Sequence, residues 1–491
     1  MLPSTTAEPY RARIRLTLGS RLQALTRVDQ RILVYAAAVA CVPLAFIVYW
    51  PAVNAFFMSD DFLVLRAVRD RSTWDVIVRA FSFPEASQLN EATLSWRPLT
   101  DLYFYAMSPL GIHAQPYHVI NIALHGVVAG LGMLLVRRLS GSDAAAVATG
   151  FIFVVAPTYD YTVGWVVEVS ELTIAICILG ALLSYHSYLT SRRHSWRDYV
   201  LTCLLVTIAV LSKESALLLT VLLPSLALWA IAEKLSVRTR QEIARSLALP
   251  LLALALYAAV NQIRDASQDD PTRSIDIHMI DNAWYYLRWL VLPNGQLGVA
   301  HAVLAISFLC AGAAALLMRR STLTLLFCWT VVAFLPYTSI KLIELRYTYL
   351  AALPFVAFLA CGCVEVVRHA PRKWQPFASA LGACLVVAAT VAGAIRSRDI
   401  QQSFAGEAAA YETAIDATRN LCGDLQADAY IYLINPPFFD AYGLNAPAAL
   451  NLYYERVHAV AVPELPPLAA FIEDKCVIQY DATTQSYTRV G

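Results

Sequence analysis

Two adjacent carboxylates, Asp60 and Asp61, stand in the segment FMSDDF directly after the first long apolar stretch. Neighbouring carboxylates repel each other, so their titrations are coupled and one of them can act as a general base. The pair could also bind a divalent cation. A third interpretation is structural, because Asp side chains accept hydrogen bonds from the free N–H groups of a helix, here one starting at Phe62.

An arginine followed by a proline, Arg97 and Pro98, opens the segment RPLTDLYF, which also holds Asp101. An arginine held in this way can bind a phosphate or a carboxylate through two parallel hydrogen bonds. The simpler alternative is a helix that starts at Pro98, with the arginine side chain extended to the membrane surface.

His118, Asn121 and His125 recur at spacings that place them on one stripe of a helix. Polar side chains in a membrane span usually face the bundle interior or a wet cavity. A metal site on a helix would need two ligands spaced four residues apart together with a carboxylate. The stripe lacks this combination. The alternatives are therefore a cavity lining and hydrogen bonds between helices.

Two short charged segments precede apolar stretches. SKES contains Lys213 and Glu214, and ELRYTYL contains Glu344, Arg346 and Tyr347. Taken singly, each is typical of side chains that extend to the membrane surface.

The composition identifies the elements that must position these residues. Of 491 residues, 58% are hydrophobic and 15% are charged, and the mean hydropathy is +0.54. Soluble proteins are about 25% charged, so this composition excludes a soluble enzyme. Lys and Arg (37) balance Asp and Glu (36), which excludes a protein that binds nucleic acid through a basic surface.

The chain is therefore predicted to be an all-α polytopic membrane protein. A span needs roughly 20 apolar residues, and eleven candidates meet this approximately. They are 31–50, 117–136, 143–157, 172–190, 198–212, 215–232, 246–262, 298–318, 322–337, 347–367 and 376–395.

Lys and Arg are more frequent in the segments that an N-inside topology leaves in the cytoplasm. We therefore expect a cytoplasmic basic N-terminus at 1–30, a transmembrane domain at 31–395 with a periplasmic loop at 51–116, and an exported C-terminus. No cleavage site follows the first span, so we interpret it as a retained signal-anchor. The compact size favours a bacterial inner membrane.

The C-terminal segment 396–491 has a different composition and is predicted to form a small α/β domain outside the membrane. It contains a helix-like stretch at 404–421 and apolar, β-rich runs at 430–434, 458–462 and 476–480. Cys422 and Cys476 would form a disulfide in an oxidising compartment; two unpaired buried thiols are the alternative.

On this topology the charged groups meet at one face of the membrane. The loop that carries Glu168 and Glu171 has no Lys or Arg. It could offer carboxylates to an acceptor, although a solvated face is the simpler interpretation. Carboxylates and cations over one wet cavity suit a substrate with an anionic phosphate and a hydroxyl nucleophile. The converging residues are Asp60, Asp61, Arg97, Lys213, Arg346, Glu168 and Glu171.

The ordered set SDD, WRPL, PYHVINIALH, SKES and LRYTYL resembles the GT-C superfamily over about 50–370. These are integral-membrane glycosyltransferases that use polyprenyl-phosphate sugars, and the similarity is greatest to bacterial relatives of the protein O-mannosyltransferases. The resemblance implies inverting sugar transfer at the extracytoplasmic face. The partners would be the lipid-linked donor, the bilayer and a protein, lipid or glycan acceptor.

The resemblance also implies a role for each candidate residue. Asp60 would be the base, with Asp61 as the other possibility and the second carboxylate positioning substrate. The donor phosphate would be bound by Arg97, Lys213 and Arg346, with Glu214 orienting Lys213. The cavity and substrate contacts would come from His118, Asn121, His125, Glu171, Glu214 and Tyr347.

The chain departs from the family pattern at two places. Val169 stands where an arginine is expected, and the region after 396 has no tetratricopeptide pattern. Some family members use a divalent metal and others do not, so a cation held by Asp60 and Asp61 remains one option. The alternatives to transfer are a transporter or flippase for lipid-linked or anionic solutes, and a non-catalytic membrane scaffold.

Overall fold

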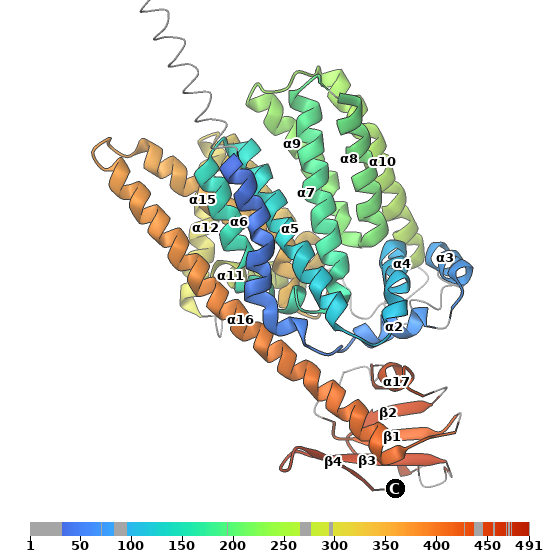
Figure 1. The fold of residues 1–491 in the computed structure, drawn as a ribbon. Helices are drawn as coiled ribbons and strands as arrows, with labels where there is room; N and C mark the ends of the chain where they lie inside the picture. Colours follow the sequence, from blue (N-terminus) through green and yellow to red (C-terminus); the bar gives the residue numbers. More distant parts are fainter. Residues whose placement is uncertain are drawn as a thin grey trace, which may run out of the picture.

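The computed structural model describes residues 32–69, 71–82, 96–193, 195–265, 276–293, 298–426, 428–436, 445–454, 457–467, 469, 472 and 474–490. Ten helices in this part of the chain are long and apolar enough to cross a membrane. They form a bundle with a small sheet beyond one end (Figure 1). The predicted all-α membrane fold with a C-terminal α/β unit is therefore confirmed.

The candidate spans of the described residues occur in the following order along the chain. The first span is Ile32–Val53. It is followed by α5 (Gln115–Ser140), α7 (Val169–Thr190), α8 (Ser195–Ser212), α9 (Leu219–Ala232), α10 (Arg240–Asp265), α12 (Val299–Leu317), α13 (Ser321–Val332), α15 (Tyr349–His369) and α16 (Gln375–Cys422).

Shorter helices gather where the spans begin or end. They are α2 (Asp61–Val68), α3 (Thr73–Phe81), α4 (Pro98–Met107), η3 (Ser108–Leu110), α11 (His278–Val291), α14 (Leu335–Thr338), η6 (Glu214–Leu218) and η7 (Leu345–Thr348). We call the end of the bundle that carries α2 and α4 the site end, and the other the opposite end. On α3, Trp74 and Phe81 are exposed, as suits a helix lying in the membrane interface.

The predicted span at 143–157 needs correction. Its helix, α6 (Asp143–Val154), has 12 residues, about 18 Å of rise against about 30 Å of hydrocarbon. Two short 3-10 helices, η4 (Pro157–Thr162) and η5 (Val166–Glu168), connect the end of α6 to the start of α7. The chain does reach the site end, because Val167 N donates to Asp61 Oδ1 over 2.8 Å. Irregular backbone at membrane depth is tolerated because protein covers it.

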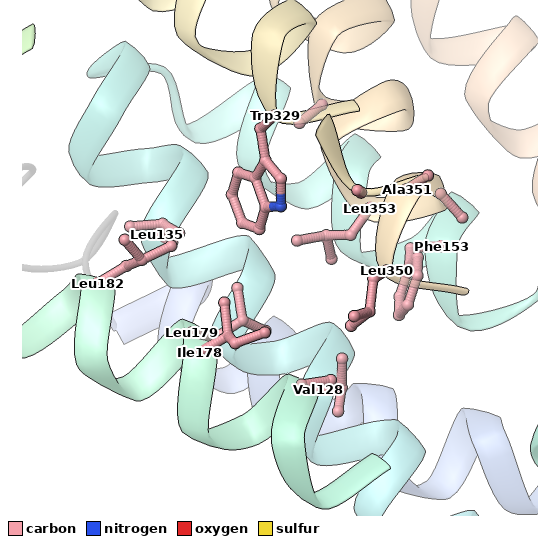
Figure 2. Packing of buried hydrophobic residues seen from close by; sticks show 14 of the residues in the cluster. Val128, Leu135, Phe153, Ile178, Leu179, Leu182, Trp329, Leu350, Ala351 and Leu353 are labelled. Carbon is pink, nitrogen blue, oxygen red and sulfur yellow. The ribbon is translucent and has the colours of Figure 1, made fainter. Parts of the chain in front are cut away.

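Apolar side chains from distant parts of the chain fill the bundle interior. Val128 of α5, Ile178 of α7, Trp329 of α13 and Leu353 of α15 meet in one cluster (Figure 2). The first span lies very close to α5, because a Cβ at Gly126 would stand 2.5 Å from Val42 Cα. Small residues allow such close approach between membrane helices.

The helix α16 changes character along its 48 residues. Its first half exposes apolar side chains such as Phe377 and Leu385, whereas its second half buries Phe404 and Tyr411. The span predicted at 376–395 and the helix predicted at 404–421 are thus one continuous helix. It runs from the opposite end past the site end to the sheet (Figure 1).

The C-terminal sheet has the order β2-β1-β3-β4. Its strands are β1 (Tyr430–Ile434), β2 (His458–Val462), β3 (Lys475–Asp481) and β4 (Ser486–Arg489), and α17 (Asn445–Leu450) packs beside them. β1 pairs in parallel with β2 and with β3, and β4 is antiparallel to β3. The three predicted strands are confirmed, whereas β4 was missed because SYTR is short and polar.

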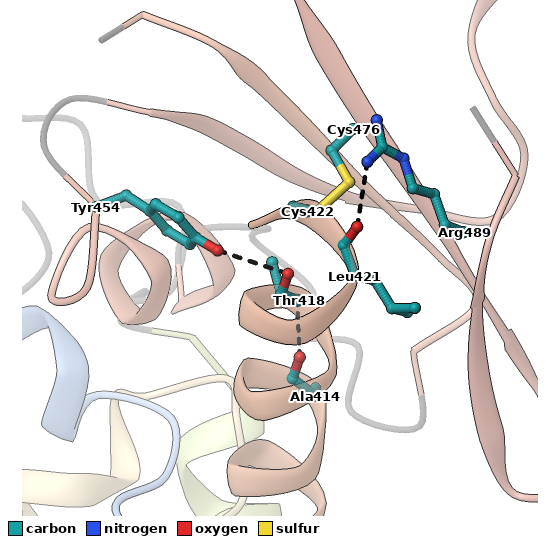
Figure 3. The surroundings of a disulfide bond; sticks show 7 residues. All are labelled: Ala414, Thr418, Leu421, Cys422, Tyr454, Cys476 and Arg489. Atoms are coloured by element: carbon teal, nitrogen blue, oxygen red, sulfur yellow. Dashed lines mark hydrogen bonds between the residues drawn. A yellow bond between two sulfur atoms is a disulfide. The ribbon is translucent and has the colours of Figure 1, made fainter. Parts of the chain in front are cut away.

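A disulfide joins Cys422, the last residue of α16, to Cys476 in β3 (Figure 3). Arg489 Nη1 donates to the Leu421 carbonyl oxygen over 3.1 Å beside it. The bridge closes a loop over a sequence separation of 54 residues, so it links the end of the long helix to the centre of the sheet. The disulfide alternative from the sequence is the one observed.

We predict that a Cys422→Ser, Cys476→Ser double variant destabilises the C-terminal sheet. A loop of this length implies a loss of about 4 kcal/mol from the unfolded-state entropy that the bridge removes. Thermal unfolding followed by limited proteolysis of the purified chain measures the effect. Equal protease resistance of the variant and the wild type would contradict it, and Cys384→Ser, an exposed cysteine of α16, serves as the control.

Candidate active site at one end of the bundle

Lys213 is the most deeply buried cation of the site end. Its side chain is 5% exposed, and Nζ lies 2.9 Å from Glu171 Oε2 and 3.3 Å from Glu168 Oε2. It occupies the tight turn where α8 ends and η6 begins, facing the start of α7. The interpretation of Glu168 and Glu171 as a solvated face was therefore wrong. Their charges are compensated by a lysine that lies 45 residues from Glu168 and 42 residues from Glu171 in the sequence.

Arg346 extends this network from η7. Its Nη1 lies 2.7 Å from Glu168 Oε1, and the guanidinium also pairs with Glu344. The guanidinium carbon stands 4.4 Å from the centre of the Trp165 ring, a cation–π contact. Glu168 thus bridges Lys213 and Arg346, and the Arg346 side chain keeps 15% exposure.

Arg97 forms a separate two-point pair. Its Nε donates to Glu214 Oε2 over 3.1 Å, and its Nη2 donates to Glu214 Oε1 over 2.8 Å. Pro98 occupies the first turn of α4, as the helix-start interpretation expected. The described ion pairs differ from the expected pairing of Glu214 with Lys213: Glu214 binds Arg97, and Lys213 binds Glu168 and Glu171.

Aromatic and amide side chains lie beside this ion-pair network. Tyr337 Oη donates to Glu171 Oε1 over 2.7 Å, and its ring stacks on Tyr347 at 4.6 Å. Asn282 Nδ2 donates to the carbonyls of Thr338 and Ile340, which fixes the chain between them. Sequence reasoning missed Trp165, Tyr337 and Asn282, because an aromatic or amide residue near a span end carries no distinguishing signal.

The two adjacent carboxylates have different surroundings. Asp61 is fully buried, and its Oδ2 and Oδ1 accept from Met58 N (3.1 Å) and Val167 N (2.8 Å). It therefore ties the loop before α2 to the turn before α7. Asp60 is half-buried, and the one described contact of its carboxylate is a 3.5 Å hydrogen bond from Ser59 Oγ. Neither Asp provides a cap to the helix N-terminus of the kind expected from the sequence.

The charges around Asp60 oppose one another. Burial raises its pKa, Arg346 and Arg97 lower it, and Glu344 and Glu168 raise it further. The pKa of Asp61 is raised well above its ordinary value, chiefly by burial, although its two backbone N–H donors oppose the shift. A carboxylate with a raised pKa is suited to accept a proton during a reaction.

His118, Asn121 and His125 form hydrogen bonds with groups from neighbouring elements. His118 contacts the Gly164 and Ala55 carbonyls at 2.7 and 3.0 Å, and His125 contacts Tyr349 Oη and the Val154 carbonyl. Asn121 Nδ2 donates to the Trp165 carbonyl over 2.8 Å. All three are fully buried, so the structure favours the alternative of hydrogen bonds between elements.

The described residues fit a divalent cation poorly. They contain no group of three or more His, Cys, Asp or Glu side chains placed to hold a metal ion. Both oxygens of Asp61 accept a backbone N–H, so this carboxylate holds the loop before α2 in place. We therefore derive no step through a metal.

Known proteins share the fold of this chain and part of its sequence. Over 87% of this chain and 64% of the other, the fold matches the apo oligosaccharyltransferase of Archaeoglobus fulgidus, with a TM-score of 0.50 and 11% identity. Two relatives in Drosophila melanogaster are named protein O-mannosyl-transferases. Tmtc1 is 32% identical over 37% of this chain, and Tmtc2 is 30% identical over 44%. No protein-family model matches.

The chain is therefore a polytopic membrane protein with the GT-C glycosyltransferase fold, and the predicted resemblance is confirmed. Its sequence relatives are protein O-mannosyltransferases. The matched segments span 21% and 24% of the two Drosophila proteins, so the chain corresponds to less than a quarter of their length.

We predict that Lys213→Met strongly destabilises the bundle. The substitution leaves Glu168 and Glu171 buried without their shared cation, and breaking such a pair typically costs about 3–5 kcal/mol. Thermal unfolding in detergent measures the loss. Arg192→Met, at an exposed ion pair of the opposite end, should cost less than about 1 kcal/mol and is the control. Equal losses in the two variants would contradict the assignment.

Proposed function

We propose that the chain is a membrane glycosyltransferase that moves a sugar from a polyprenyl-phosphate donor to an acceptor hydroxyl, with inversion at the sugar carbon. The observation that carries the proposal is the contrast between Asp60 and Asp61. One carboxylate is fixed by backbone donors, whereas its neighbour is half-buried and its pKa responds to the charges of Arg346 and Arg97. The GT-C fold and the O-mannosyltransferase relatives support the same chemistry.

Asp60 is the general base. Its carboxylate takes the proton of the acceptor hydroxyl while that oxygen attacks the anomeric carbon of the donor. The bond between this carbon and the phosphate oxygen breaks, and its electron pair leaves on the lipid phosphate. Because the attack comes from the side opposite the leaving group, the configuration inverts. The raised pKa of Asp60 brings the base nearer to neutral pH, where proton transfer is most effective.

Asp61 is a positioning residue. Its two hydrogen bonds, to Met58 N and Val167 N, hold Ser59 and Asp60 at the start of α2. The backbone of Ser59 has a φ of +49°, which is unusual for a residue with a side chain. The bonds on both sides of this residue keep in place the turn that carries Asp60.

Arg97 and Arg346 stabilise the leaving phosphate. Both guanidinium groups keep part of their surface exposed, 18% for Arg97 and 15% for Arg346. Either could bind a phosphate oxygen through donors that their glutamate partners do not use. Lys213 is the weakest of the three predicted phosphate ligands, because its ammonium is buried between two carboxylates. Its role is to hold Glu168 in the position that orients Arg346.

The site end would face the extracytoplasmic side. The Cys422–Cys476 disulfide lies beyond this end, and disulfides persist in oxidising compartments. The excess of Lys and Arg in the loops of the opposite end supports the same orientation. The donor's lipid tail would remain in the bilayer while its sugar-phosphate reaches the network.

We predict that Asp60→Asn reduces sugar transfer by about 10²–10⁴-fold without lowering thermal stability, because the amide cannot accept the hydroxyl proton. Asp61→Asn should instead lower the free energy of unfolding by about 1–3 kcal/mol, because its NH₂ group opposes a buried backbone N–H. Purified protein given radiolabelled polyprenyl-phosphate hexoses and pentoses supplies the activity, and thermal unfolding supplies the stability. Full transfer by Asp60→Asn would overturn the assignment of the base.

The pH dependence of transfer gives an independent test. Glu344 raises the pKa of Asp60 and also pairs with Arg346, whose charge lowers that pKa. Glu344→Gln removes the first effect and frees Arg346 to strengthen the second, so both changes lower the pKa of Asp60. A base works when deprotonated, and the acidic limb of the rate profile should therefore move to lower pH. A limb that stays in place or moves to higher pH would refute this. Glu242→Gln, at the opposite end, is the control.

A further inference from the structure

A polar cavity lies at the opposite end of the bundle. Its volume is about 320 Å³, and its walls come from the ends of α5, α9 and α15 and from the turn between α12 and α13. Arginines and glutamates dominate its lining: Arg319, Arg320, Arg368, Glu233 and Glu365.

This cavity is remote from the site end. Arg346 and Arg368 stand near the two ends of the same membrane helix, η7 with α15. The 22 residues between them correspond to about 33 Å of helical rise. None of the cavity's residues takes part in the proposed sugar transfer. A ligand site in this cavity therefore does not depend on that proposal.

Positive charge exceeds negative charge in the lining. Glu365 lies 2.7 Å from Arg320 Nη1 and 3.9 Å from Arg368 Nη1, so one carboxylate serves two arginines. Glu233 accepts a hydrogen bond from the Ser321 hydroxyl. No ion pair joins Arg319 to another residue in the described part of the chain, which leaves its guanidinium available to a ligand.

The backbone holds Arg319 at the edge of the cavity. Its φ is +54°, and the turn is closed by hydrogen bonds from Arg319 N to the Leu316 carbonyl (3.1 Å) and from Arg320 N to the Ala315 carbonyl (2.9 Å). The cavity is thus built on a fixed turn between two packed helices.

Apolar side chains surround the arginines on the outside of the bundle. Leu317 is 83% exposed, Met318 65% and Val366 72%. On membrane helices such residues face the hydrocarbon, so a headgroup in the cavity would have its acyl chains on these side chains. Basic pockets at the cytoplasmic ends of membrane helices suit anionic headgroups.

The structure assigns this cavity as a binding site for the phosphate headgroup of an anionic phospholipid. Arg319 and Arg368 bind the phosphate oxygens, and the Arg320–Glu365 pair forms the wall behind them. The lipid joins the ends of α12, α13 and α15 and fixes their depth in the leaflet opposite the site end.

The test uses the full chain purified in a neutral detergent. Short-chain phosphatidylglycerol, short-chain phosphatidylcholine and inorganic phosphate are titrated separately, and thermal stability is recorded. Phosphatidylglycerol should raise the melting temperature of the wild type in a saturable manner, whereas the other two should not. Arg319→Gln and Arg368→Gln should each weaken the apparent affinity about tenfold, in line with the loss of one charge-assisted contact. Arg372→Gln, on the neighbouring α15–α16 turn and outside the lining, should leave it unchanged.

Three results would overturn the assignment. Inorganic phosphate alone could give the whole stabilisation, in which case the ligand is a free phosphate and not a lipid. Phosphatidylcholine could act as well as phosphatidylglycerol, or Arg319→Gln and Arg368→Gln could bind like the wild type. Both variants remove exposed or partly exposed side chains, so folding should be preserved, and a wild-type melting temperature without lipid verifies this.

Discussion

The buried pairing of Lys213 with Glu168 and Glu171 is the interaction on which the site end depends. A lysine at 5% exposure is expensive to bury unless its charge is compensated, and here two carboxylates from the start of α7 compensate it. Glu168 then bridges to Arg346, and Glu171 receives the Tyr337 hydroxyl. One buried cation therefore fixes the relative positions of α7, α8 and α15.

The C-terminal region supports the same network from the other side. Phe62, on the helix that follows the acidic pair, packs against Tyr411 of α16 at 5.7 Å between ring centres. Arg69, just beyond that helix, donates to the carbonyls of Asn451 and Leu452 next to α17. The helix that begins at Asp61 thus shares one apolar core with the sheet. The sheet contributes to holding Asp60 in place without supplying a charged group to the network.

Much of the fold was predictable because membrane spans and short strands leave strong periodic signals. The strands at 430–434, 458–462 and 475–481 follow from β-branched and aromatic runs. The pairing within the site was less predictable. The sequence indicated that Glu168, Glu171, Lys213 and Arg346 meet at one face. Which partner each residue takes depends on the rotation of each helix. No periodicity records that rotation to within one side chain.

The difference between Asp60 and Asp61 also depends on tertiary contacts. Both residues belong to one dipeptide, and only the position of the Val167 N–H beside Asp61 distinguishes the carboxylate that binds distant backbone from its neighbour. The residues missed altogether, Trp165, Tyr337 and Asn282, act through ring faces and amide hydrogen bonds. Such groups are common at helix ends and become informative only once their neighbours are known.

The central claim is that sugar leaves its lipid carrier at the end of the bundle that carries Asp60 and the C-terminal sheet. The most direct measurement uses proteoliposomes in which the protein has one known orientation and the polyprenyl-phosphate sugar is present in one leaflet at a time. The account predicts sugar release, with inverted configuration in the product, when the donor occupies the leaflet at the site end. Release from the other leaflet only, or movement of intact donor between leaflets without release, would contradict it and favour a transporter.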